Sequence, residues 1–190
     1  MKLRRSLAFV GLRCTGKSTV GALVAREFDA GFVDLDEALR YSFQSDCCSA
    51  HGTSLGEWIE AHGWDAFRAA EQAELARVLD NGEPRVIATG GGVVEREVNR
   101  RLLALRTTVI WLRESVEVLA RRAAADGRGR PALVAGGWAN EFREIGARRA
   151  PLYAECAHIA IDCCGRAPAE LAREVRARLE LYANSRPADS

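Results

Sequence analysis

The chain has 190 residues, 48% of them hydrophobic and 28% charged, which is typical of one globular domain with a sizeable core. The formal net charge is +1, so composition gives no general attraction to nucleic acid or to an acidic membrane surface, and we expect neither partner. The short apolar run near the N-terminus is interrupted by Arg13 and Lys17, which argues against a secretory signal, and no stretch approaches the roughly 18 apolar residues of a membrane span. We therefore expect a cytoplasmic protein.

Cysteine spacing agrees with that expectation. The zinc-type C-x-x-C pattern is missing from the sequence, and the chain is too long for a small disulfide-stapled domain. We expect reduced thiols at all six positions: Cys14, Cys47, Cys48, Cys156, Cys163 and Cys164.

Short apolar runs alternate with segments of helical periodicity along the whole chain. The apolar runs predict strands at 7–10, 32–35, 85–89, 107–112 and 158–162. The periodic segments predict helices at about 17–28, 57–80, 95–105, 115–125, 138–155 and 168–183. Strand-then-helix repetition at this spacing predicts an α/β fold, a three-layer sandwich with a central parallel five-stranded sheet and helices on both faces. We expect residues 1–190 to form a single domain.

Two segments interrupt this alternation. Residues 41–55, which follow a short helix, are polar and rich in small side chains, and residues 125–137 mix Gly, Pro and Arg. A surface linker is the simplest interpretation of both. The second segment carries more arginine than a linker needs, and its flanking glycines would allow it to hinge.

The stretch FVGLRCTGKSTVG contains Gly11-x-x-x-x-Gly16-Lys17-Ser18, the P-loop pattern, between a predicted strand and a predicted helix. In this context backbone N–H groups converge on a β-phosphate at the positive helix N-terminus. Lys17 supplies a charge to the β- and γ-phosphates, and Ser18 supplies a hydroxyl ligand to Mg²⁺. Cys14 is tolerated in such a loop if its backbone angles are ordinary.

Two further groups follow predicted strands, at the sheet edge where open α/β sheets bind ligands. Asp34 and Asp36 end the second strand and can hold a Mg²⁺-bound water or accept a proton from a hydroxyl; the alternative is that Asp36 caps a helix. Gly90, Gly91 and Gly92 follow the third strand and allow a small molecule to approach the backbone, although a tight turn is the alternative.

Arginines supply the remaining candidates. Arg68 and Glu71 lie one helical turn apart, so Glu71 can orient the guanidinium, but spacing alone favours an exposed ion pair. Arg148 and Arg149 precede an aromatic residue, and one of them could bind a carboxylate in bidentate fashion; a solvated arginine is the simpler interpretation.

Taken together, six segments in order resemble the shikimate kinase family over nearly the whole chain. GLRCTGKSTVG is similar to that family's Walker A loop, FVDLDEAL to its FxDxD segment and WDAFRAAE to its FRxxE segment. IATGGGVV resembles its glycine triplet, GRGRPAL the lid motif R-P-x-L, and RAPLYAECAHIAID the R-x-x-L-Y segment. The resemblance implies a P-loop kinase fold and phosphorylation of the 3-hydroxyl of shikimate by ATP and Mg²⁺, in chorismate and aromatic amino-acid biosynthesis.

The resemblance also implies residue roles. Asp36, Arg68 and Arg149 would bind shikimate, with Gly90, Gly91 and Gly92 lining its pocket in a substrate region of about 36–80. Ser18 and, through water, Asp34 would hold Mg²⁺, and Lys17, Asp34 and Arg130 would be catalytic, with Arg130 in a lid at about 125–137. ATP would contact these residues: Gly11, Cys14, Thr15, Gly16, Lys17, Ser18, Thr19, Arg122 and Arg130.

Departures from the family pattern keep alternatives open. Cys14 replaces a usual glycine, and the 41–55 segment is several residues longer than the family norm and follows Asp36 closely. One alternative is another P-loop kinase, acting on gluconate or a nucleoside, and the carboxylate clamp of Arg68 and Arg149 is the feature that discriminates it. The other is a non-catalytic nucleotide-binding protein, which would bind ATP without turnover. We expect a monomer, as is common in the family.

Overall fold

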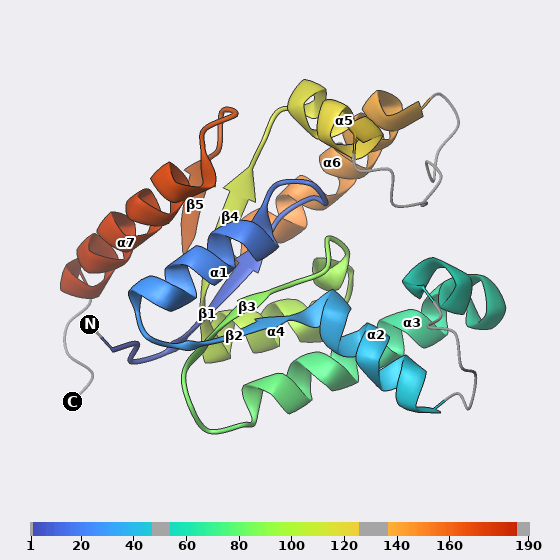
Figure 1. Ribbon diagram of the computed structural model, residues 1–190, viewed down its shortest axis with the longest axis horizontal. Helices are drawn as coiled ribbons and strands as arrows, with labels where there is room; N and C mark the ends of the chain where they lie inside the picture. The colour runs from blue at the N-terminus through green and yellow to red at the C-terminus, as the bar shows by residue number, and fades with distance from the viewer. Residues whose placement is uncertain (1, 47–53, 126–136, 186–190) are drawn as a thin grey trace.

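A computed structural model describes residues 2–46, 54–125 and 137–185 (Figure 1). Its strands are β1 (Ser6–Val10), β2 (Gly31–Asp34), β3 (Arg85–Ala88), β4 (Thr107–Arg113) and β5 (Ile159–Asp162). All four strand pairings are parallel and the order is β2-β3-β1-β4-β5. The predicted α/β fold with a parallel five-stranded sheet is therefore confirmed, and each predicted strand agrees with the structure to within about one residue at either end.

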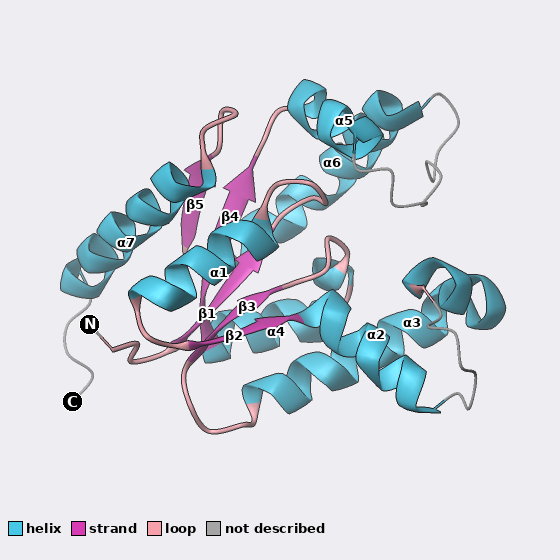
Figure 2. Cartoon of the chain, viewed as in Figure 1, coloured by secondary structure: helices cyan, strands magenta, loops and turns pink. Residues whose placement is uncertain are grey.

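The helices are α1 (Lys17–Glu27), α2 (Leu35–Asp46), α3 (Leu55–Leu79), α4 (Glu97–Arg106), α5 (Val116–Ala125), α6 (Gly137–Cys156) and α7 (Pro168–Ser185), with a 3₁₀ turn η1 (Val93–Glu95). They flank both faces of the sheet (Figure 2). Much of the 41–55 segment is helical, since α2 continues to Asp46 and α3 begins at Leu55 behind a Ser54–Glu57 capping box. Residues 47–53, with Cys47 and Cys48, and residues 126–136, with Arg130 and most of the expected lid, lie outside the described residues.

Alternating side chains of the strands build two cores, one on each face. Leu7 and Phe9 of β1 pack in a cluster with residues of α1 and α7, whereas Ala8 and Val10 pack with residues of α3, α4 and α6. A strand whose two faces are both buried has to be apolar at every position, which explains the continuous run LAFV. The cores fix the carboxyl ends of β1, β2 and β3 side by side.

Helix α3 is interrupted, contrary to the single helix predicted over 57–80. Gly63 has φ 83° and ψ 164°, which breaks the helical path and starts a new direction at Trp64. Glycine adopts this left-handed φ without the steric cost that a Cβ imposes. A third hydrophobic cluster, including Leu39, Phe43 and Phe67, joins α2 to the two halves of α3. The interruption matters because Phe67 and Arg68 begin the second half.

Within the described ranges, no helix is both long enough and apolar enough to cross a membrane.

Candidate active site

The P-loop connects β1 to α1 as the sequence predicts. Gly16, at the N-cap of α1, has φ 92°, a conformation that favours glycine. The buried Lys17 ammonium donates hydrogen bonds to the carbonyl oxygens of Gly11 (3.0 Å) and Leu12 (2.8 Å). The ammonium is thus held over the loop, close to where the α1 N-terminus attracts an anion.

Cys14 departs from the expectation of ordinary backbone angles. Its φ is 63°, in the left-handed region, where a residue with a Cβ costs about 1–2 kcal/mol. Its carbonyl oxygen accepts a 3.0 Å hydrogen bond from Arg122 of α5, and Arg122 also lies 3.5 Å from the carboxylate of Glu114. The loop therefore keeps the shape that a glycine would favour, and contacts to α5 hold it.

Asp34 joins β2 to both the P-loop and α2. Its Oδ2 accepts a 2.5 Å hydrogen bond from the Ser18 hydroxyl, and its Oδ1 accepts from the backbone N–H groups of Asp36 (3.0 Å) and Glu37 (3.3 Å). The helix-capping role considered for Asp36 therefore belongs to Asp34, because α2 begins at Leu35, two residues before the start that a cap at Asp36 would give. The Asp36 side chain instead lines a pocket.

The glycine triplet follows β3 and lies in van der Waals contact with charged side chains. A Cβ on Gly90 would lie 2.7 Å from Oε1 of Glu71 and 2.8 Å from Oδ1 of Asp36. A Cβ on Gly92 would lie 2.0 Å from Nη2 of Arg68. Only glycine fits at these two positions without displacing the neighbouring groups, so the triplet is more than a tight turn.

Two arginines from distant helices reach this triplet. Arg68 donates a 2.7 Å hydrogen bond from Nη1 to Oε2 of Glu71, and the side chains are 12% and 1% exposed, so the exposed ion pair favoured by spacing is wrong. Of the two candidate arginines on α6, Arg149 is 11% exposed and Arg148 is 64% exposed. Arg149 is therefore the one that faces the site, and it is not a solvated side chain.

These groups enclose one pocket beside the P-loop. Its polar lining includes Asp36, Arg68, Glu71, Arg149 and the glycine triplet, and its apolar lining includes Trp64, Phe67, Phe142 and Ile145. Among the described residues, the site brings together every candidate predicted to bind an acceptor.

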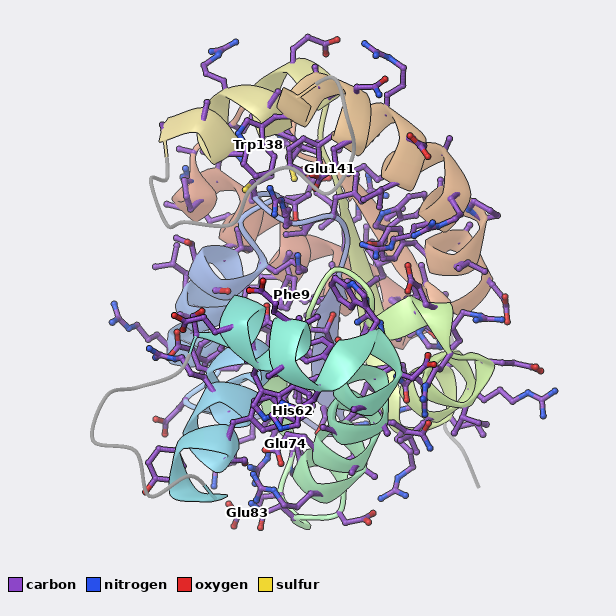
Figure 3. All side chains as sticks on the ribbon, turned by 90° about the vertical axis from the view of Figure 1, so that its right-hand side faces the viewer. Phe9, His62, Glu74, Glu83, Trp138 and Glu141 are labelled. Atoms are coloured by element: carbon purple, nitrogen blue, oxygen red, sulfur yellow. The ribbon has the colours of Figure 1, made fainter. Side chains whose placement is uncertain are left out.

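The sequence did not single out the contacts that join the P-loop to α6. The Arg13 guanidinium lies 4.0 Å from the ring centroid of Trp138 and, through Nε, 3.6 Å from Oε1 of the buried Glu141. Figure 3 shows Trp138 and Glu141 next to each other at the α6 side of the molecule. Glu95, which contacts both Arg68 and Arg149, was likewise not predicted from the sequence. No local spacing signals such contacts, because the partners are far apart in the chain.

Burial sets the ionisation of two charged groups here. Burial lowers the pKa of Lys17 to about 8, although the nearby carboxylates of Asp36 and Asp34 act in the opposite direction. Burial also raises the pKa of Glu71, and the Arg68 guanidinium only partly offsets this. The buried Lys17 ammonium is therefore poised to gain from an anionic ligand such as a phosphate.

The fold and the site together define a class. A P-loop at the end of β1, in a parallel sheet of this order, with a separate pocket lined by arginines and carboxylates beside it, is the arrangement of an ATP-dependent kinase that acts on a small molecule. A family model described as shikimate kinase matches residues 13–180. The chain belongs to the shikimate kinase family, which confirms the resemblance drawn from its motifs.

Individual relatives agree with this assignment. A shikimate kinase of Paracidovorax citrulli is 36% identical over 178 residues, covering 93% of this chain and 92% of that protein. One of Nitrobacter winogradskyi is 39% identical over 149 residues, covering 78% of this chain and 65% of the relative. The solved shikimate kinase of Acinetobacter baumannii in complex with shikimate superposes with a TM-score of 0.83 at 27% identity, covering 96% of each chain.

Proposed function

We propose that the protein transfers the γ-phosphoryl group of ATP to a hydroxyl group of shikimate, the 3-hydroxyl by family resemblance. The observation that carries the proposal is the pocket beside the P-loop, in which Arg68 and Arg149 lie with Asp36 and the glycine triplet. Two guanidiniums suit a carboxylate, and a carboxylate side chain accepts hydrogen bonds from hydroxyls. A polyhydroxylated carboxylic acid fits this combination.

In the acceptor half, we assign Arg68 and Arg149 to the substrate carboxylate and Asp36 to its hydroxyl groups. Gly90, Gly91 and Gly92 present backbone to the substrate at close range. The support is the burial of both arginines and the absence of space for a Cβ at Gly90 and Gly92. The Asp36 carboxylate lies close enough to the Lys17 ammonium of the P-loop to act on the pKa of Lys17, so it is suited to place a hydroxyl toward the transferring phosphoryl group.

In the nucleotide half, we assign the P-loop backbone and Lys17 to the phosphates, and Arg122 to the neighbourhood of the adenine. Lys17 already lies over the loop, and Arg122 is anchored to the carbonyl of Cys14. The remaining assigned contacts to ATP are Gly11, Cys14, Thr15, Gly16, Ser18 and Thr19. Phosphoryl transfer needs alignment and charge neutralisation more than covalent chemistry, and these groups supply both.

For Mg²⁺, the pair Ser18–Asp34 fits the ion's preference for oxygen ligands. Their oxygens lie 2.5 Å apart at the N-terminal end of α1, close to where the phosphates are assigned. No cluster of three or more His, Cys, Asp or Glu occurs in the part of the chain that the structure describes, and Mg²⁺ in kinases binds through one or two protein ligands, waters and substrate phosphates. When bound there, the ion would neutralise charge on the β- and γ-phosphates.

Some assignments rest on resemblance alone. We propose that Arg130 completes the site from a lid at about 125–137 and supplies positive charge to the transferring group, worth about 10³-fold in rate if it acts as an arginine finger. We also propose a single cytoplasmic domain over residues 1–190 that acts as a monomer, with its substrate region at about 36–80.

Replacing either clamp arginine tests the proposed function. Arg68→Ala and Arg149→Ala should each raise KM for shikimate at least about tenfold while leaving KM for ATP within about twofold, because each removes a charge-assisted hydrogen bond to the carboxylate. Arg148→Ala is the neighbouring comparison and should change KM for shikimate far less. If both clamp variants keep the wild-type KM, the acceptor assignment is wrong.

A further inference from the structure

Glu95 lies between the two arginines that we assign to the substrate carboxylate. Its Oε1 accepts hydrogen bonds from Arg149 Nε (2.9 Å) and Nη2 (2.7 Å), and its Oε2 lies 3.4 Å from Arg68 Nε. Arg148 donates a further 2.9 Å bond to Oε1. One carboxylate thus contacts guanidiniums from α3 and from α6.

These contacts orient both guanidiniums toward the glycine triplet. Arg149 engages Glu95 with two nitrogens, and its third, Nη1, lies 3.6 Å from where a Cβ on Gly91 would be. Arg68 uses Nη1 for Glu71 and turns Nε toward Glu95, which leaves Nη2 against Gly92. Each arginine therefore points a terminal nitrogen to the same stretch of backbone, on the pocket side.

Glu95 itself lies behind this pair. The described side chains that line the pocket include those of Arg68 and Arg149 but not that of Glu95. Burial alone would raise the pKa of Glu95, but Arg149, Arg68 and Arg148 together outweigh burial and hold the pKa below its ordinary value. Glu95 is therefore an ionised anchor at neutral pH.

We infer that Glu95 is a positioning residue that sets the separation and orientation of the two arginines for a monocarboxylate acceptor. The inference rests on the proposed function. It explains how Arg68 and Arg149, which lie 81 positions apart on different helices, form one clamp: both are tied to Glu95, the last residue of η1, three positions after Gly92. Long arginine side chains lose considerable rotamer entropy when they become ordered. In an anchored pair this entropy is lost on folding, so substrate binding does not have to offset it.

A competing role predicts the opposite kinetic effect. If Glu95 were an internal anion that the substrate must displace, removing its charge would tighten shikimate binding. The geometry argues against displacement, because Arg149 meets Glu95 through its Nε edge and directs Nη1 elsewhere. The sign of the change in KM therefore separates the two roles.

The test compares Glu95→Gln with Glu97→Gln. Glu97 lies two positions away and pairs only with the exposed Arg101 among the interactions described, so it is a matched control for loss of one carboxylate. Glu95→Gln should raise KM for shikimate about tenfold, with kcat and KM for ATP within about twofold, because the amide is uncharged and places an NH₂ donor opposite one of the two arginines. Glu97→Gln should match wild type. Glu95→Asp, which shortens the side chain, should lie between the two.

A neutral substrate analogue separates an effect of Glu95 on carboxylate binding from a general loss of enzyme activity in the variant. With the methyl ester of shikimate, wild type and Glu95→Gln should show nearly the same kcat/KM, because the ester offers no carboxylate to the clamp. Unchanged or lowered KM for shikimate in Glu95→Gln, beside raised KM in Arg68→Ala and Arg149→Ala, would overturn the inference and leave the proposed function intact. Lack of shikimate turnover by the wild-type protein would overturn both.

Discussion

Arg68 and Glu71, one turn apart on α3, form a buried ion pair 2.7 Å long, with side chains 12% and 1% exposed. Glu71→Ala leaves Glu95, 3.4 Å from Nε of Arg68, as the remaining carboxylate partner of that buried guanidinium, so it should lower the free energy of unfolding by about 2 kcal/mol and raise KM for shikimate. Glu37 and Arg40 on α2 also form an i,i+3 pair, but their side chains are 62% and 47% exposed, so Glu37→Ala should cost less than about 1 kcal/mol. Urea unfolding measures both changes, and equal losses in the two variants would contradict the distinction.

Asp34 both caps α2 and accepts the Ser18 hydrogen bond, and two substitutions separate these roles. Asparagine is as good a helix cap as aspartate, so Asp34→Asn should alter stability little but lower kcat about 100-fold through loss of the metal-site charge. Asp34→Ala should lose the activity and, in addition, about 1 kcal/mol of stability. Thermal unfolding beside steady-state kinetics at varied Mg²⁺ checks this; near-wild-type kcat in Asp34→Asn would remove Asp34 from the metal site.

The lowered pKa of Lys17 predicts a proton linked to nucleotide binding. With a pKa of about 8, much of the Lys17 population is neutral at pH 8.5, and bound phosphates would raise that pKa toward 10.5. Binding of Mg²⁺-ADP at pH 8.5 should therefore take up a fraction of a proton, seen by calorimetry in buffers of different ionisation enthalpy, and the uptake should fade at pH 6.5. Lys17→Met is the control, and equal uptake in that variant would assign the proton elsewhere.

The lowered pKa of Lys17 also predicts how the free energy of unfolding changes with pH. Between pH 8 and 10.5 the unfolded chain binds more protons at Lys17 than the folded protein does. The contribution of Lys17 to the free energy of unfolding therefore rises as pH increases through that window. Below pH 8 the folded protein bears the full cost of burying the charged ammonium. Lys17→Met should lose this pH dependence.

Cys14 tests the backbone strain of the P-loop. Cys14→Gly should raise the free energy of unfolding by up to about 1 kcal/mol, since glycine adopts the φ of 63° freely but loses more chain entropy on folding. Cys14→Ala removes the same thiol and keeps the Cβ, so it should give no such gain. Turnover should persist in both variants. Equal stability of Gly and Ala at this position would show that the loop is unstrained.

The features that followed from sequence are those with a local cause. The alternation of apolar strand segments with segments of helical periodicity predicted the parallel sheet, and the spacing from Gly11 to Ser18 predicted the P-loop. Short-range pattern also found Arg68, Arg149 and the glycine triplet, although it misjudged the burial of the two arginines.

The features that the sequence left open depend on contacts across the fold. Glu95 meets Arg149 across 54 positions, and the P-loop residue Cys14 meets Arg122 across 108, so no spacing rule reveals either pair. The break at Gly63 depends on the backbone angles of one residue, and the cap at Asp34 depends on a two-residue shift of a helix start. Hydrophobic periodicity does not define helix boundaries that closely.

The first measurement is the release of ADP from Mg²⁺-ATP in a coupled assay with and without shikimate. We expect strong turnover that depends on shikimate, with Cys14 in the loop and the long 41–55 segment both tolerated. Tight ATP binding without any response to shikimate would contradict the proposed function and would indicate a different acceptor for the pocket of Asp36, Arg68 and Arg149.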